Sequence, residues 1–106
     1  MARFDVYRLP GRLALLVVDV QADLLSDLMS RVVVPLEPKS SARPERLPRL
    51  EPEFRIAGKD YIFKPTDIAV LPSNVLRKPV ANVEADYRNE VVAALDFLFF
   101  GLGIFL

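Results

Sequence analysis

Short apolar runs, each ended by proline or other turn-forming residues, follow one another from the start of the chain to Pro72. Runs of this length between turn residues are typical of β-strands. Residues 4–8 form the first and end at Leu9-Pro10-Gly11, where glycine permits the positive φ of a tight turn. Residues 12–21 are so rich in valine and leucine that they predict a central strand buried on both faces. The two strands together predict a hairpin.

Four more strands are predicted further along the chain. Residues 31–36 form one, and its Pro35 should lie at a strand end, an edge or a bulge because proline cannot donate to a ladder. Residues 54–56 and 61–63 flank Ala57-Gly58-Lys59-Asp60 and predict a second hairpin. Residues 68–71 form a short strand that Pro72 ends.

Two irregular segments separate these strands. Residues 22–30 allow two interpretations: a short helix with Leu24, Leu25, Leu28 and Met29 on one face, or a loop that displays Leu24 and Leu25. Residues 37–53 contain prolines that block long helices and central strands, together with charges of both signs. They predict a long surface loop, which in a compact domain is more often functional than idle.

Residues 85–106 predict a C-terminal helix with two apolar sides. At about 100° per residue, one stripe faces the core; it contains Val91, Leu95, Leu98 and Leu102, with Val92 and Phe99 beside it. The opposite side carries four apolar residues and one acid: Ala93, Phe97, Phe100, Ile104 and Asp96. A short domain has one core, so the second side needs a twin subunit, a target protein or a membrane.

A membrane is the weakest of these three partners for the helix. The apolar part is about 16 residues long, whereas a spanning helix needs about 20. Asp96 also interrupts it. We therefore expect a protein-binding face and no membrane partner.

Composition narrows the function classes. The chain has 106 residues and 52% apolar content, which predicts one domain over residues 1–106 with a real core. Its formal net charge is zero, so no overall charge attracts nucleic acid or anionic membrane. Cysteine and histidine are absent, which removes thiolate nucleophiles, the commonest general base and the commonest transition-metal ligands. We expect no cofactor. The start of the chain lacks the apolar run of a signal peptide, so we expect a cytoplasmic protein.

Isolated polar residues leave a catalytic alternative open. Asp19, Asp23 and Asp67 could supply paired carboxylates, although short acids usually serve turns and caps. Arg31 and Thr66, with a nearby acid, could cleave RNA without histidine, since arginine stabilises the charge of a phosphorane. The basic residues between positions 39 and 64 are largely offset by acidic residues, although an acidic peptide could still pair with some of the arginines.

The order of several short motifs resembles the CcdB family of toxins. These motifs are Val18-Asp19-Val20-Gln21 with Asp23, Val34-Pro35-Leu36, Thr66-Asp67 and the helix ending Phe100-Gly101-Leu102. The resemblance implies a mainly β (α+β) fold: a small SH3-like antiparallel barrel-sheet with a C-terminal α-helix. It also implies a homodimer that is not an enzyme. Such a toxin binds the DNA gyrase A subunit and traps the gyrase–cleaved DNA complex. A CcdA-like antitoxin neutralises it, and operator DNA is bound only together with that antitoxin.

The same resemblance implies two sets of contact residues. The gyrase-binding set is Leu24, Leu25, Asp96, Phe99, Phe100, Gly101 and Leu102. The antitoxin-binding set is Arg8, Pro10, Arg12, Arg43, Arg46 and Arg49. The family pattern has tryptophan at Phe100 and usually asparagine at Asp96, and it ends before Gly103-Ile104-Phe105-Leu106. Two alternatives remain: an endoribonuclease toxin that uses Arg31 and Thr66, and a protein of this fold that binds its antitoxin but poisons nothing.

Overall fold

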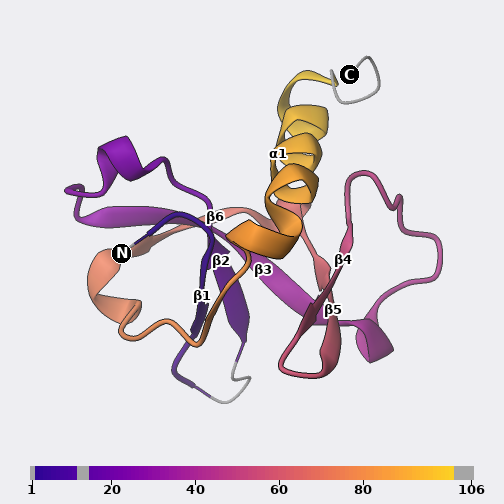
Figure 1. The fold of residues 1–106 in the computed structure, drawn as a ribbon, viewed down its shortest axis with the longest axis horizontal. Coiled ribbons are helices and arrows are strands. Elements are labelled where there is room, and N and C mark those ends of the chain that lie inside the picture. Colours follow the sequence, from indigo (N-terminus) through magenta and orange to yellow (C-terminus); the bar gives the residue numbers. More distant parts are fainter. Residues whose placement is uncertain (1, 12–14, 102–106) are drawn as a thin grey trace.

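The fold is a strongly curved antiparallel sheet with one helix across it (Figure 1). The computed structural model describes residues 2–11 and 15–101. The strands are β1 (Asp5–Arg8), β2 (Leu16–Asp19), β3 (Ser30–Pro38), β4 (Glu53–Ile56), β5 (Lys59–Phe63), β6 (Ala69–Pro72) and β7 (Ala81–Asn82). The helix is α1 (Glu84–Phe100), and four 3-10 turns are η1 (Asp23–Leu25), η2 (Lys39–Ser41), η3 (Pro65–Asp67) and η4 (Ser73–Val75).

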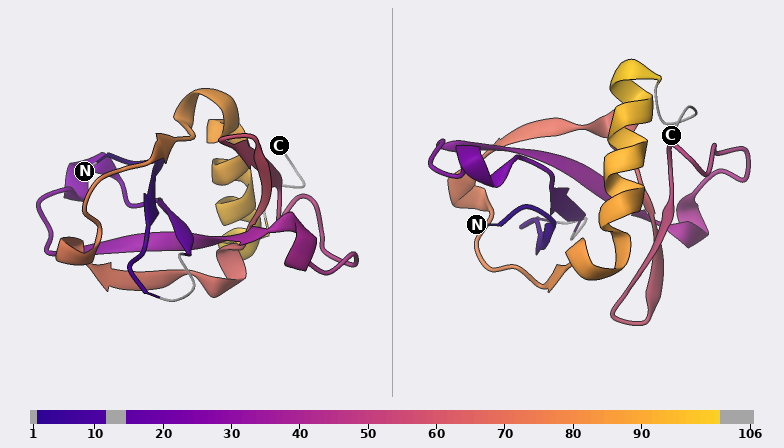
Figure 2. Two further views of the ribbon diagram at one scale, coloured as in Figure 1. Left: turned by 90° about the horizontal axis from the view of Figure 1, so that it is seen from below. Right: turned by 45° about the horizontal axis from the view of Figure 1, so that its top comes forward.

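The strand order is β4-β5-β3-β2-β1-β7, and β6 pairs separately with β3. Because β3 has two partners on one side, the sheet divides there and curls into a nearly closed barrel (Figure 2). This confirms the mainly β class with a C-terminal helix. The two-residue strand β7 was not predicted, because Ala81-Asn82 carries no strand signal of its own.

Pro35 lies inside β3 and not at its end. On one side of β3, pairing with β6 stops at Val33 and pairing with β5 starts at Leu36. Pro35 therefore lies at a local edge, where its missing N–H removes no ladder bond. Its carbonyl accepts a hydrogen bond from the Lys64 N–H at 3.0 Å.

Both predicted hairpins are present. In the first, β1 and β2 pair with Val6 opposite Val18; part of its predicted second strand, residues 12–14, lies outside the described residues. In the second, Ile56 pairs with Lys59, so the turn is only Ala57-Gly58. Both turn residues have positive φ, 52° and 80°. That combination matches the twist of the flanking strands, but it is strained for alanine.

The core lies between the curved sheet and α1. The ring of Phe54 stacks on Phe63 at 5.3 Å and on Tyr87 of α1 at 4.4 Å. Val91 and Ala94 are the fully buried residues of the helix, and Leu95 packs at the margin. The predicted stripe was therefore rotated, because it omitted Ala94, whose small side chain allows the helix close to the strands.

The helix ends earlier than predicted. It stops at Phe100, and Gly101 takes the left-handed conformation with φ 66° while its N–H donates to the Phe97 carbonyl at 3.0 Å. Glycine is the usual residue at this position because it has no Cβ to clash. Leu102 and Ile104, which the sequence placed on the helix, lie outside the described residues. In the described part of the chain, no helix is both long and apolar enough to cross a membrane.

Candidate protein-binding surface

The first group of exposed apolar side chains lies on the loop of residues 22–29. Leu24 is 93% exposed and Met29 is 86% exposed, while about half of Leu25 and of Leu28 is exposed. Only η1 has helical character here, so the predicted short helix with one shared apolar face is wrong. The second interpretation, a loop that displays Leu24 and Leu25, describes the structure.

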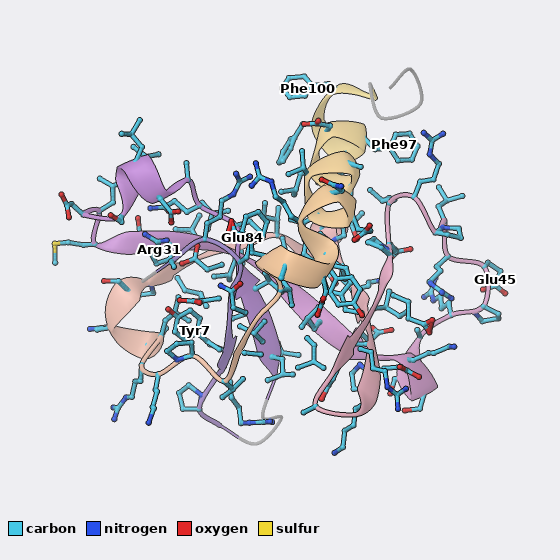
Figure 3. All side chains as sticks on the ribbon, in the orientation of Figure 1. Tyr7, Arg31, Glu45, Glu84, Phe97 and Phe100 are labelled. Carbon is cyan, nitrogen blue, oxygen red and sulfur yellow. The ribbon has the colours of Figure 1, made fainter. Side chains whose placement is uncertain are left out.

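The second exposed group is the last turn of α1. The rings of Phe99 and Phe100 lie 6.5 Å apart in a tilted arrangement, and Phe100 is 71% exposed. Figure 3 shows Phe100 projecting from the end of the helix, away from the sheet. Asp96, one turn earlier, is half-buried. Gly101 fixes where this turn stops.

The side of α1 opposite the core-facing stripe is partly covered by another segment of the same chain. The guanidinium carbon of Arg49 lies 5.9 Å from the centre of the Phe97 ring, within cation–π range. A small cavity of about 150 Å³ separates Pro48 and Pro52 from Ala93 and Phe97. The proline-rich loop therefore supplies some of the second surface that the sequence assigned to a partner.

The predicted gyrase-binding residues form two groups within one chain. The loop that contains η1 and the last turn of α1 project from different parts of the molecule in every view (Figures 1 and 2). Leu24 and Leu25 are in one group, and Phe99, Phe100, Gly101 and Asp96 in the other. Leu102 lies outside the described residues.

The predicted antitoxin-binding residues are also divided. Arg8 and Pro10 are exposed at the end of β1 and in the following turn, whereas Arg12 lies outside the described residues. Arg43 is exposed. Arg46 donates from Nε to the Glu51 carbonyl at 3.4 Å, and Arg49 lies over Phe97. Arg46 therefore braces the loop internally, and Arg49 holds it to the helix.

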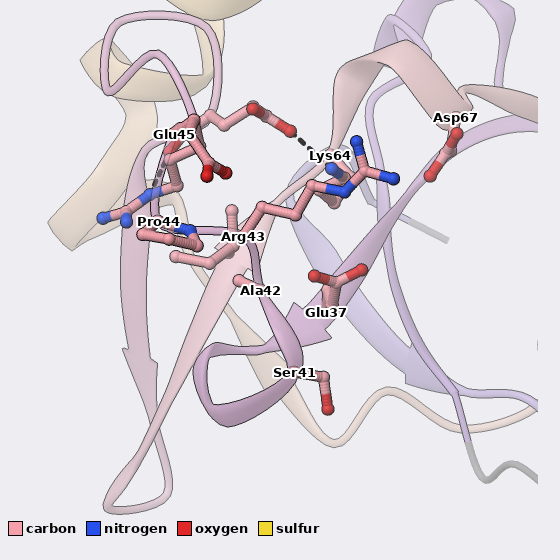
Figure 4. A pocket seen from close by; sticks show the side chains of 11 residues that line it. Glu37, Ser41, Ala42, Arg43, Pro44, Glu45, Lys64 and Asp67 are labelled. Atoms are coloured by element: carbon pink, nitrogen blue, oxygen red, sulfur yellow. Dashed lines mark hydrogen bonds and ion pairs between the residues drawn. The ribbon is translucent and has the colours of Figure 1, made fainter.

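A cavity of about 930 Å³ lies beneath the same loop (Figure 4). Glu37, Glu51 and Asp67 meet Arg43 and Lys64 there, and Arg43 reaches across toward Lys64 and Asp67. Lys64 Nζ lies 2.6 Å from Glu51 Oε2, and this hydrogen bond raises the pKa of Lys64. The sequence showed the mixed charge of this segment but gave no sign of this solvent-open pocket.

Arg31 is not available to a substrate. It is fully buried, with Nε 2.8 Å and Nη2 2.6 Å from Oδ2 of Asp19, which is also fully buried. Burial raises the pKa of Asp19, against the opposing effect of Arg31. Thr66 is exposed in η3. Because Arg31 is enclosed, this geometry does not support the pair as an RNA-cleaving site.

The other candidate carboxylates have structural roles or stand alone. Asp23 accepts a hydrogen bond from the Arg3 N–H at 2.7 Å, a contact between distant segments and not the local turn bond that the sequence suggested. Asp67 faces the cavity beneath the loop. Among the described residues, no group of three or more acids could hold a metal ion.

The sheet, the helix and the two apolar projections define a small, mainly β protein of the barrel-like α+β class, with surfaces of the kind that bind other proteins. The chain matches the model of the CcdB protein family over residues 3–101. It therefore belongs to the CcdB family, whose members are toxins of toxin–antitoxin pairs, and the sequence resemblance is confirmed. No curated protein matches the chain significantly.

Sequence reasoning missed two residues that shape these surfaces. Gln21 lies under the loop of residues 22–29, where its side chain bonds to main-chain groups on two segments. Phe97 was assigned to a partner but contacts Arg49. The sequence signals for Gln21 were its place in the family motif Val18-Asp19-Val20-Gln21 and its polarity at the end of a largely apolar run, and neither indicated contacts with two segments.

Proposed function

We propose that this toxin binds the DNA gyrase A subunit, traps the gyrase–cleaved DNA complex, and acts by binding without catalysis. The observation that carries the proposal is Phe100, a largely exposed ring on the capped end of a rigid helix. Large aromatic anchors of this kind supply much of the energy of protein interfaces. Burying such a side chain contributes about 1.5–3 kcal/mol.

Leu24 and Leu25 supply a second apolar contact in this proposal. Because they lie apart from Phe100 within one chain, we propose that the toxin works as a homodimer. A two-fold axis then provides two copies of each projection. A target could contact the loop of residues 22–29 and the end of α1 together, from one or both protomers.

The charge of Asp96 restricts which partner surface can cover Phe100. Asp96 is half-buried one turn before Phe100, so a partner that covers the ring also approaches this carboxylate. A carboxylate that loses water on binding requires a cationic or hydrogen-bond-donating partner group. We therefore expect the gyrase surface opposite Asp96 to be basic or rich in donors.

Neutralisation by an acidic antitoxin segment fits the arginines of the mid-chain loop together with Arg8 at the end of β1. Arg43 and Arg8 are exposed, and guanidinium groups bind carboxylates in a two-pronged geometry. Arg46 and Arg49 are engaged within the protein, so an acidic segment that uses them has to displace their present contacts. Binding of operator DNA is proposed only for the toxin together with its antitoxin.

The test is a DNA-cleavage assay with purified gyrase and three proteins: wild type, Phe100→Ala and Val80→Ala. Val80 is a half-exposed apolar residue before β7, so its variant controls for the loss of exposed apolar surface elsewhere. We expect linear, enzyme-linked DNA with wild type and Val80→Ala. Phe100→Ala should reduce cleavage by tenfold or more, since one buried aromatic ring is worth about 1.5–3 kcal/mol.

Absence of both cleavage and gyrase binding by the wild-type protein would contradict the proposal. Retained cleavage by Phe100→Ala would remove Phe100 as the anchor. A wild-type protein that binds its antitoxin but leaves gyrase unaffected would favour the alternative of a non-poisoning relative.

A further inference from the structure

The loop of residues 22–29 has little packing of its own to hold it. Every residue from 22 to 29 is exposed. Its local hydrogen bonds run from the Leu25 N–H to Ala22 O at 2.9 Å, from the Ser26 N–H to Asp23 O at 3.0 Å and from the Leu28 N–H to Leu25 O at 3.1 Å. A short turn of this kind is marginal by itself. The Ser73 N–H ties the end of the loop by donating to Met29 O at 2.8 Å, so the shape of its middle depends on the residues beneath it.

Gln21 is the residue beneath it. Its side chain is buried, with 7% exposed, and both ends of the amide are bonded. Nε2 donates to the Leu25 carbonyl at 2.8 Å, and Oε1 accepts from the Val32 N–H at 3.1 Å. The amide therefore links the apolar loop to β3, at the leucine that the loop displays.

Gln21 is in turn held by the buried core. Its own N–H donates to Oδ1 of Asp19 at 3.0 Å, while Oδ2 of Asp19 is occupied by Arg31. A second anchor lies outside the core, where Asp23 binds the Arg3 N–H. A continuous set of hydrogen bonds thus runs from a fully buried ion pair to the carbonyl of Leu25.

We propose that Gln21 is a positioning residue of the target-binding surface, which fixes the loop of residues 22–29 in the shape that presents Leu24 and Leu25 to the protein target. The inference rests on the proposed function, because it assumes that these leucines contact gyrase. A loop that is ordered before binding loses less conformational entropy when it binds. Removing one such hydrogen bond should weaken binding about tenfold.

The main variant is Gln21→Met, which keeps the side-chain length and removes both hydrogen bonds. Gln21→Glu is the second variant: it keeps an acceptor for the Val32 N–H, replaces the donor to Leu25 with a carboxylate oxygen and adds a buried negative charge. It retains the contact with β3 if Gln21→Met fails to fold. Tyr87→Phe is the matched control. It removes one side-chain acceptor of a main-chain N–H, that of Arg55 at 2.9 Å, and keeps the stacked ring.

Two measurements decide the proposal. Amide hydrogen exchange should become faster at Leu25, Ser26 and Leu28 in the Gln21 variants and stay unchanged there in Tyr87→Phe. Affinity for the purified gyrase A subunit should fall about tenfold in the Gln21 variants. When Leu24 is already alanine, substituting Gln21 should reduce the affinity for the gyrase A subunit much less, because Gln21 acts through the leucines.

The positioning role would be overturned if amide exchange in the loop were unchanged in the Gln21 variants. It would also be overturned if their loss of affinity added fully to the loss caused by Leu24→Ala. A wild-type protein that fails to bind the gyrase A subunit overturns the proposed target instead. The exchange measurement then decides by itself whether Gln21 orders the loop, so the two failures are distinguishable.

Discussion

The two long irregular segments at the ends of β3 are held in opposite ways. The loop of residues 22–29 precedes this strand, is rich in exposed leucine, and is bonded from below by the neutral amide of Gln21. The segment of residues 39–52 follows the strand and is rich in proline and charge. Ion pairs hold it, Lys39–Glu53 at 2.7 Å and Lys64–Glu51 at 2.6 Å.

The first segment exposes apolar side chains to a partner, whereas the second covers apolar surface of the protein itself. The first segment leaves its apolar side chains in water, which is useful only if a partner later buries them. The second places Arg49 over Phe97 and so covers part of an apolar helix side. We infer that salt acts mainly on the second segment, because exposed and half-buried charges are screened whereas neutral amides are not.

The largest expected effect concerns the ion pair beneath the first segment. Arg31→Met should lower the free energy of unfolding by about 3–5 kcal/mol, because it leaves the buried carboxylate of Asp19 without its cation. Urea denaturation measures this loss. Arg55→Met, which removes an exposed pair with Asp60 at 2.9 Å, is the control and should cost less than about 1 kcal/mol. Equal losses in the two variants would mean that burial does not distinguish the pairs.

The next effect is a loss of stability in alkali. Tyr7 is buried near the same ion pair, and burial, followed by the carboxylates of Asp5 and Asp19, raises its pKa from 10.0 to about 12. The folded state therefore favours the neutral phenol. This contribution is fully present below pH 10 and is lost as the pH rises toward 12, by up to about 3 kcal/mol.

Urea unfolding of wild type and Tyr7→Phe at pH 9 and pH 11 tests this. We expect the wild type to lose more stability over this interval than Tyr7→Phe, which has no phenol to ionise. The pKa of Lys64 is also raised, so its ion pair with Glu51 also weakens as the pH rises. Both proteins contain this ion pair, so it contributes equally to the pH dependence of their stability. Equal pH dependence in the two proteins would exclude Tyr7 as the source.

The strands were predictable because their patterns are local. Proline and glycine mark most strand ends, and Ala57-Gly58 lies where the sequence placed a turn. Pro35 shows the limit of such reasoning, because its tolerance depends on β3 changing partners at that residue. The buried face of α1 was predicted in part: Val91 lies in the core as expected, but the stripe was rotated, since periodicity favours large residues such as Leu98 whereas close packing selected Ala94.

The candidate site was less accessible to sequence reasoning. Exposure of Leu24 and Phe100 follows from apolar residues with no place in one core, and that part of the prediction is confirmed. The links between distant segments do not follow from any local pattern. Gln21 reaches Val32 because β3 returns beside β2, and Arg49 reaches Phe97 because the proline-rich segment folds back onto the helix.

The smallest expected effect tests whether that segment covers the helix in solution. Arg49→Ala should lower the free energy of unfolding by only about 0.5–1 kcal/mol, the usual range for an exposed cation–π contact. It should also uncover the Phe97 ring, so binding of a hydrophobic dye should increase, while Arg43→Ala, on the same segment, should leave dye binding unchanged. An unchanged dye signal with Arg49→Ala would show that Pro48 and Pro52 cover the ring without the arginine. The second segment would then be held over the helix by its ion pairs and prolines, and the contrast with the amide-held first segment would rest on those contacts.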